Sequence, residues 1–185
     1  MALENGREQR LHEYTPWADP EHDPPGGGGA THLSRIVAEL VPLIDRTFRT
    51  RARAPERGIC GASLGGLMAA YAGYAHPEVF GRIAAVSPSI WWRDRRLLRH
   101  VAATPKPPAR IFYADMGTLE AGGLPALRAL RAALVADGFV EGEDLFVEAV
   151  PGAGHDEGAW RARFPDILRR LFPLGRRACR SPTRD

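Results

Sequence analysis

The chain has 185 residues, of which 44% are hydrophobic and 25% charged, and its formal net charge is +3. These values are typical of one globular domain. Almost all the basic residues are arginines, and so small a net positive charge gives no argument for nucleic-acid binding. The two cysteines, Cys60 and Cys179, make no disulfide framework and favour a reduced, cytoplasmic setting. The sequence contains no run of about 18 apolar residues, so no membrane span is predicted, and the N-terminus lacks the apolar core of a signal peptide.

The chain divides into three predicted segments. Residues 1–30 are rich in proline and glycine and are expected to form a loop segment, residues 31–173 the main folded domain, and residues 174–185 a basic, disordered tail. Thr31 is a candidate N-cap for a helix that continues to Phe48 with a kink at Pro42.

Strands and helices alternate from residue 57 onward. Apolar runs predict strands at 59–60, 83–87, 110–114 and 145–150, with Cys60 in a buried strand; helices are expected after residue 64 and at 93–103, 124–136 and 159–171. This order predicts an α/β fold with a parallel sheet of about four to five strands and right-handed crossovers. Functional residues of such sheets lie on loops at the carboxyl ends of the strands.

The stretch from Gly61 to Gly65, Gly-Ala-Ser-Leu-Gly, lies between an apolar strand and an alanine-rich helix. This is the pattern of a nucleophile elbow, in which two glycines allow close approach of strand and helix and the central serine is exposed at a strained turn. Ser63 is therefore a candidate nucleophile. The alternative is a glycine-rich turn with an idle serine.

A serine nucleophile needs a base, and an acid to orient that base. His155 follows the last predicted strand in a glycine-containing loop and is the candidate base, unless it only helps to begin the last helix. Glu120 follows the preceding strand and is the favoured acid, with Asp115 as the rival. The chain order of serine, acid and histidine is that of α/β-hydrolases.

The stretches GICGASLGGLMAAYAGYAHPEVFGRIAAVSPSIWW, GTLE and GAGHDEGAWRARF resemble the "putative esterase" family of α/β-hydrolases, above all its enterochelin-esterase-like branch. The resemblance covers about residues 5 to 172. It implies an ester hydrolase with Ser63 as nucleophile, His155 as base and Glu120 as acid, acting on a small-molecule ester. The backbone N–H of Leu64 would be an oxyanion donor.

The resemblance also suggests that Trp91 and Trp92 wall a substrate pocket; filling the core is the equally weighted alternative. Compared with the family, the chain lacks the first half of the sheet and the loop that gives a second oxyanion donor, so we expect an N-terminally truncated fold with impaired activity. The strand before Ser63 would then be an open edge that invites self-association. A start upstream of Met1, a gene remnant or a second chain would each account for this.

Two functions remain open. The leading hypothesis is a serine carboxylesterase working through an acyl-enzyme, and the alternative is a catalytically weak or inactive remnant or binding module. No spacing of histidines predicts a metal site, and no phosphate loop or dinucleotide fingerprint is present, so no cofactor is predicted.

Overall fold

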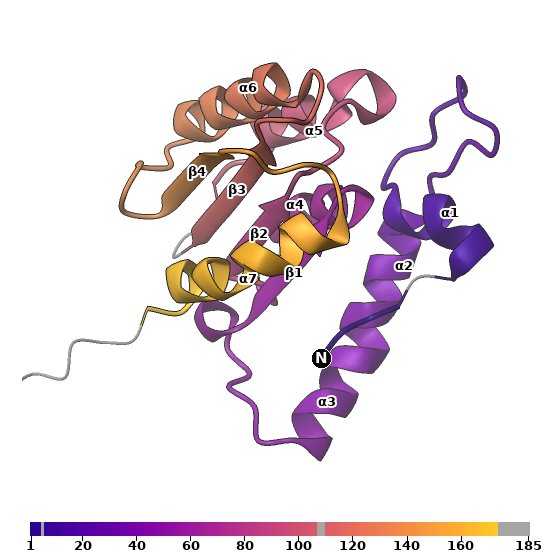
Figure 1. The fold of residues 1–185 in the computed structure, drawn as a ribbon. Helices are drawn as coiled ribbons and strands as arrows, with labels where there is room; N and C mark the ends of the chain where they lie inside the picture. Colours follow the sequence, from indigo (N-terminus) through magenta and orange to yellow (C-terminus); the bar gives the residue numbers. More distant parts are fainter. Residues whose placement is uncertain (5, 107–109, 174–185) are drawn as a thin grey trace, which may run out of the picture.

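The computed structural model describes residues 1–4, 6–106 and 110–173, so the predicted tail at 174–185 lies outside the described residues. One sheet of four parallel strands has the order β1-β2-β3-β4 (Figure 1). The strands are β1 at Gly58–Ala62, β2 at Arg82–Val86, β3 at Ile111–Gly117 and β4 at Leu145–Val150. The predicted parallel α/β fold is confirmed.

Ten helical segments are described in the same part of the chain. They are η1 (Arg7–Gln9), α1 (Arg10–Tyr14), α2 (Gly29–Arg35), η2 (Ile36–Leu40), α3 (Val41–Thr47), η3 (Ala54–Glu56), α4 (Leu64–Ala75), α5 (Trp92–Ala103), α6 (Gly123–Ala136) and α7 (Glu157–Leu171). No helix among these residues is long and apolar enough to cross a membrane.

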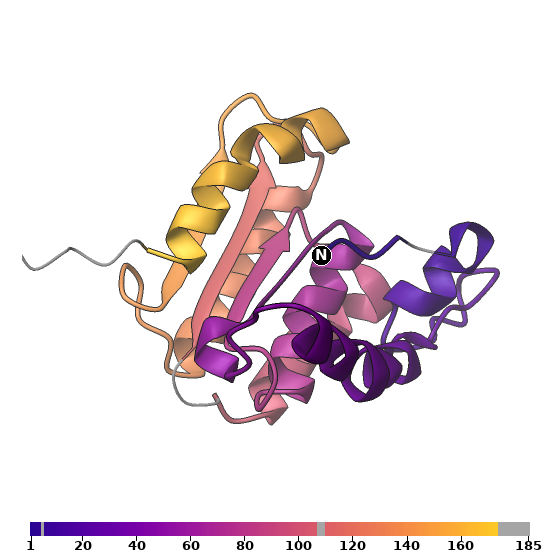
Figure 2. The ribbon, with the colours of Figure 1, turned by 90° about the horizontal axis from the view of Figure 1, so that it is seen from below.

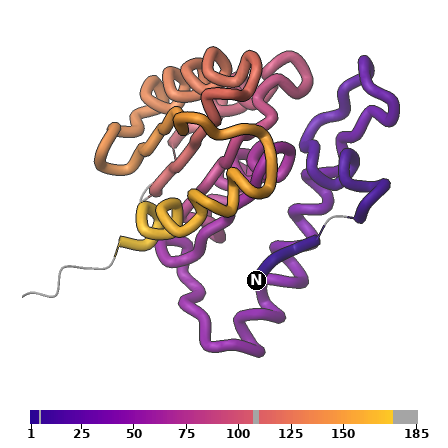
Figure 3. The backbone as a smooth tube through the Cα atoms, in the orientation of Figure 1, coloured from indigo at the N-terminus to yellow at the C-terminus, as the bar shows by residue number. Residues whose placement is uncertain are grey.

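The sheet is covered on both faces, as parallel sheets usually are. Ile83 and Phe112 belong to a core shared with α4, α5 and α6, whereas the alternate residues Ala84 and Tyr113 pack against α7 on the other face. Figure 2 shows α7 on one side of the strands and α4 on the other. The N-terminal helical segments lie outside α4, where Leu33 and Met68 share a hydrophobic cluster. Figure 3 shows the indigo α1 at the right of the molecule and the yellow end of α7 at the left.

The strand register aligns the carboxyl ends of neighbouring strands. Ala62 pairs with Val86, and Gly117 pairs with Val150. The loops that follow the four strands therefore lie along one edge of the sheet, and all the candidate catalytic residues come from these loops.

The prediction that residues 1–30 form only a loop is wrong. The segment contains η1 and α1, and Thr15 and Asp19 are buried. Leu11 and Tyr14 pack against the main core, so tertiary contact stabilises a helix of five residues that would not form alone. The next helix begins at Gly29, before the predicted cap at Thr31.

The predicted kink at Pro42 takes the form of a wider helical turn. Residues Ile36–Leu40 are π-helical, and the N–H of Val41 bonds to the carbonyl of Ile36. Proline has no N–H, and its ring crowds the carbonyl four residues earlier, so the extra residue in the turn relieves this conflict.

Cys60 is exposed, contrary to the prediction of a buried strand. It pairs in register with Ala84 and so faces the side of the sheet that α7 covers. Because α7 packs on β2 and β3, its cover does not extend over the edge strand β1.

Candidate active site

Ser63 lies between β1 and α4 in a strained backbone conformation. Its φ and ψ are 58° and −121°, a region that non-glycine residues rarely adopt. Its N–H donates to the carbonyl of Val86 at 3.0 Å, and its carbonyl accepts from the N–H of Ser89 at 3.0 Å. The end of β2 therefore holds the turn that presents the Ser63 hydroxyl.

Close backbone contacts leave no room for a side chain at two glycines of this turn, Gly61 and Gly66. A Cβ at Gly61 would lie 2.3 Å from the carbonyl oxygen of Gly65, and one at Gly66 would lie 2.8 Å from that of Val86. A Cβ at Gly65 would meet nothing within 4 Å. The backbone of Gly65 therefore fills the space that a side chain at residue 61 would need, and only glycine fits at that position.

His155 approaches Ser63 from the loop between β4 and α7. Its Nε2 lies 3.0 Å from the Oγ of Ser63, although 92 residues separate the two in sequence. The side chain is 46% exposed, so a ligand in solvent can reach it. The ring of Trp160 packs edge-on against the imidazole, with 5.0 Å between centroids. The next residue, Asp156, caps α7 by accepting from the N–H of Ala159 at 2.9 Å.

Glu120 contacts the other nitrogen of this ring. Its Oε2 lies 2.7 Å from Nδ1 of His155, and its side chain is only 6% exposed. The turn that carries Glu120 is tied to the histidine loop, because the N–H of Leu119 donates to the carbonyl of Ala153 at 3.1 Å. Docking of one loop on the other brings the carboxylate to the imidazole.

Asp115, the rival acid, faces a different partner. It has no exposed surface, and its carboxylate accepts from the guanidinium of Arg163 at 2.7 and 3.0 Å. The hydroxyl of Tyr113 donates to it at 2.9 Å. Burial raises the pKa of Tyr113, and the charge of Asp115 raises it further, so Tyr113 stays a neutral donor. Asp115 thus lies within the sheet and α7, and Glu120 is the carboxylate at the histidine.

Leu64 is the first residue of α4, directly after Ser63. An N–H in the first turn of a helix has no carbonyl partner within that helix and lies at the positive end of the helix dipole. The Leu64 amide thus belongs to the positive end of α4, one residue after Ser63 in the chain.

The two predicted pocket tryptophans have different environments. Trp91 is 55% exposed and remains a candidate pocket residue. Trp92 is fully buried in the main core, and its indole N–H donates to the carbonyl of Trp17 at 2.7 Å. The proposal that Trp92 walls a pocket is therefore withdrawn, because a side chain without exposed surface offers no wall to a ligand.

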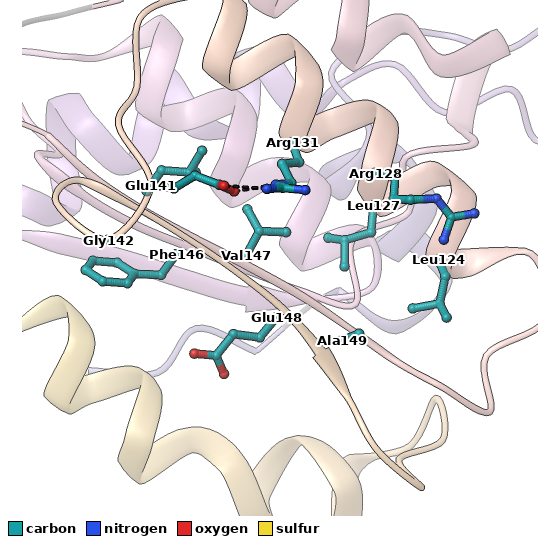
Figure 4. A pocket seen from close by; sticks show the side chains of 11 residues that line it. Leu124, Leu127, Arg128, Arg131, Glu141, Gly142, Phe146, Val147, Glu148 and Ala149 are labelled. Atoms are coloured by element: carbon teal, nitrogen blue, oxygen red, sulfur yellow. Dashed lines mark hydrogen bonds and ion pairs between the residues drawn. The ribbon is translucent and has the colours of Figure 1, made fainter.

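A cavity of the described residues lies away from this site. It has a volume of about 580 Å³ and lies between α6 and the edge strand β4. Leu127 and Val147 form part of its apolar lining, and an ion pair between Arg131 and Glu141 crosses it (Figure 4). Within the described ranges, no group of three or more His, Cys, Asp or Glu side chains could hold a metal ion.

Sequence reasoning missed a group of side chains behind Glu120. Ser87 donates from its Oγ to the Oε1 of Glu120 at 2.6 Å, and Arg163 and Trp160 both contact the same hydroxyl. Ser89 also lies close, with its Oγ 3.4 Å from that of Ser63. The Ser-Pro-Ser turn after the second strand was the only sequence signal for these residues. The sequence does not indicate which side chains of α7 face the sheet, so it could not predict the contacts of Trp160 and Arg163.

The sheet, the strained serine turn and the loops that bring histidine and glutamate to it define the α/β-hydrolase class. Comparison with known proteins gives the family: residues 2–171 match the model described as "Putative esterase". The chain belongs to this family, as its resemblance predicted.

Curated relatives to which the chain is similar include a Bacillus protein and an Escherichia coli esterase. It is 28% identical over 180 residues to "Uncharacterized protein YbbA" of Bacillus subtilis (strain 168), covering 91% of this chain and 72% of that protein. It is 35% identical over 129 residues to the "Iron(III) enterobactin esterase" of Escherichia coli (strain K12), covering 68% of this chain and 32% of that protein. The chain thus spans only about a third of the named enterobactin esterase.

Among solved structures, the chain is similar to the enterobactin esterase FES from Shigella flexneri, crystallised in the presence of enterobactin. The TM-score is 0.72 at 26% identity, and the match covers 92% of this chain and 40% of the other. BES protein from Bacillus cereus shares the fold, with a TM-score of 0.71 at 21% identity over 91% of this chain and 64% of that one. Family and relatives together support an esterase-type hydrolase.

Proposed function

We propose that the chain is a serine carboxylesterase that works through an acyl-enzyme, with Ser63 as nucleophile, His155 as base and Glu120 as the acid that orients it. One observation carries this proposal. Ser63 Oγ, both ring nitrogens of His155 and a carboxylate oxygen of Glu120 form a continuous chain with contacts of 3.0 and 2.7 Å. A hydroxyl, an imidazole and a carboxylate in this order activate a serine.

In the first half-reaction, Nε2 of His155 takes the proton of the Ser63 hydroxyl while Oγ attacks the ester carbonyl carbon. The carbonyl oxygen becomes an oxyanion, for which the N–H of Leu64 is the donor we assign. The imidazolium then returns its proton to the departing alcohol oxygen as the ester C–O bond breaks. The acyl group remains on Ser63.

In the second half-reaction, His155 takes a proton from water, and the resulting hydroxide adds to the acyl carbon. Collapse of this second tetrahedral adduct breaks the bond to Ser63, which recovers its proton from His155. Throughout the cycle the carboxylate of Glu120 holds Nδ1–H and stabilises the positive ring.

A small-molecule ester is the proposed substrate. The half-exposed Trp91, whose ring lies against those of His22 and Trp92, is the candidate apolar surface for this substrate. Because the chain is similar to proteins named as iron(III) enterobactin esterases, siderophore esters belong in the first substrate panel, beside acetyl and longer acyl esters of p-nitrophenol.

An active-site fluorophosphonate probe, followed by tryptic digestion, tests the nucleophile. Trypsin places Ser63 in the peptide 58–82 and both Ser87 and Ser89 in the peptide 83–93, so mass spectrometry separates the candidates. We expect label on 58–82 and a burst of p-nitrophenol from p-nitrophenyl acetate, both abolished in Ser63→Ala. A folded protein without label and without burst would favour the alternative of an inactive remnant or binding module.

We further propose that two copies associate through the open side of β1, which is an edge strand of the described sheet. An edge strand presents unpaired backbone groups, and charged side chains disfavour pairing there. Sedimentation velocity should show a dimer that Cys60→Lys converts to monomer. A monomeric parent protein at all concentrations would end this proposal.

A further inference from the structure

Helix α7 directs two polar side chains toward the region behind the candidate active site. Trp160 and Arg163 are three residues apart and therefore share a helix face. The Arg163 side chain is buried and paired with the fully buried Asp115. The Nη2 amino group of Arg163 donates to Asp115 at 3.0 Å and also to the Oγ of Ser87 at 2.7 Å.

Ser87 occupies an unusual place in this arrangement. It follows β2 with a φ of 41°, in the left-handed region, and its Oγ has three neighbours. These are the guanidinium of Arg163 at 2.7 Å, the indole N–H of Trp160 at 3.2 Å and the Oε1 of Glu120 at 2.6 Å.

The donor and acceptor inventory leaves only one hydrogen-bond direction. Arginine and tryptophan side chains donate and never accept, and a serine hydroxyl has two lone pairs and one proton. Both lone pairs of Ser87 are occupied by Arg163 and Trp160. The single proton must therefore point to Glu120.

The direction of the hydrogen bond from Ser87 to Glu120 also determines which ring nitrogen of His155 carries the proton. Oε1 of Glu120 accepts from Ser87 and from the N–H of Gly117 at 2.7 Å, which leaves Oε2 for Nδ1 of His155. An ionised carboxylate only accepts, so Nδ1 carries the proton and Nε2 keeps its lone pair for the Ser63 hydroxyl. A base must have this tautomer to take the serine proton.

Stability alone does not account for the buried arginine. A buried ion pair is often no more stabilising than apolar side chains of similar size, because both charges lose their hydration. Moreover, one amino group of Arg163 is buried with no partner among the described residues, which carries its own cost. The geometry instead connects this cation to the carboxylate at the histidine.

We propose that Ser87, Trp160 and Arg163 are positioning residues that fix Glu120 as an acceptor and thereby set the tautomer of His155. Asp115 anchors the guanidinium of Arg163 in this arrangement. The inference rests on the proposed function, and its test includes a measurement that does not require turnover.

Removal of the Ser87 hydroxyl is the direct test. Ser87→Gly suits the positive φ, and Ser87→Ala retains a side chain there, so agreement between the two separates loss of the hydroxyl from backbone strain. We expect kcat to fall roughly 10- to 100-fold, the size expected for one hydrogen bond to a charged group, with KM within about twofold. Active-site titration corrects for any unfolded fraction.

Trp160→Phe keeps an aromatic ring beside His155 but is smaller than the indole and lacks the N–H that donates to Ser87. We expect kcat to fall about three- to tenfold, since Ser87 gains a free lone pair and its proton can turn away from Glu120. Arg161→Lys, at an exposed position of the same helix, is the matched control and should leave kcat and KM unchanged.

Proton NMR gives the measurement that is independent of turnover. The Nδ1–H of His155, bonded to Glu120, should give a far-downfield resonance that His155→Gln removes and that the Ser87 variants shift or broaden. If the parent protein hydrolyses no ester but shows this behaviour, the positioning inference stands and the proposed function fails. If the parent is an esterase, and the Ser87 and Trp160 variants keep its resonance and its kcat, the inference is overturned and the function stands.

Discussion

Asp115 and Arg163 form an ion pair in which two guanidinium nitrogens contact the carboxylate at 2.7 and 3.0 Å. Asp115 has no exposed surface, and the Arg163 side chain is almost as deeply buried. The carboxylate at the end of β3 is thereby committed to α7. Glu120, five residues later, is the carboxylate that reaches the histidine loop.

This difference predicts opposite outcomes for two substitutions. Glu120→Gln should lower kcat about 10²- to 10⁴-fold at nearly unchanged stability, because an amide stabilises the imidazolium poorly and disturbs its tautomer. Asp115→Asn should lower the free energy of unfolding by about 3 to 5 kcal/mol, because it leaves a buried guanidinium without its counter-charge. Steady-state kinetics and urea unfolding measure the two. A stable Asp115→Asn protein without activity, beside an active Glu120→Gln protein, would contradict this assignment.

The elbow glycines give a matched pair of variants. Gly61→Ala should destabilise the protein by about 1 to 3 kcal/mol, because the new Cβ would lie 2.3 Å from the backbone oxygen of Gly65 and neither backbone can yield easily. Gly65→Ala meets open space and should be neutral or stabilise α4 by up to about 1 kcal/mol. Urea unfolding midpoints compare them. A Gly61→Ala protein as stable as the parent would show that the close approach is absent.

His100 should make stability depend on pH. It packs among the rings of Trp17, Tyr71 and Tyr74, and burial, with a smaller contribution from Arg96, lowers its pKa from the usual 6.5. The unfolded chain then binds the proton more readily than the folded one. Stability is therefore fully present above about pH 6.5 and falls as the pH drops below that value, until the folded-state pKa is passed.

The variant His100→Phe keeps an aromatic ring in this cluster and removes the titration. Thermal unfolding midpoints between pH 8 and pH 5 should fall less steeply in His100→Phe than in the parent protein. Identical pH dependence in the two proteins would exclude His100 as the source.

Asp19 should stabilise the strained start of α5. Residues 93–95 have φ values of 50°, 49° and 54°, a left-handed turn without glycine. The buried carboxylate of Asp19 accepts from the N–H of Arg93 at 3.1 Å and from that of Glu21 at 3.1 Å. Asp19→Ala should cost about 1 to 3 kcal/mol and release the turn.

Limited trypsin digestion reports on this turn, because Arg93 and Arg95 are exposed. Cleavage after these residues should be faster in Asp19→Ala than in the parent, and Asp19→Asn, which retains an acceptor oxygen, should lie between them. Unchanged cleavage rates in all three proteins would mean that the turn does not depend on Asp19.

The sequence predicted the sheet well because each strand is a short apolar run that ends at a glycine, serine or proline. It predicted the first 30 residues badly, because α1 is stabilised by the packing of Leu11 and Tyr14 on the core and has no strong local pattern. The exposure of Cys60 was missed for a related reason: a buried-strand pattern does not reveal that the covering helix stops short of the edge.

Sequence by itself determined the order of strands and helices, the serine turn, and the strand ends and loops that carry a histidine and two carboxylates, since these follow from local periodicity and glycine placement. Tertiary structure alone decided which carboxylate meets His155, which tryptophan is exposed, and that Arg163 contacts Ser87 across 76 residues of chain. Such contacts depend on how whole elements dock, and local preference carries no information about that.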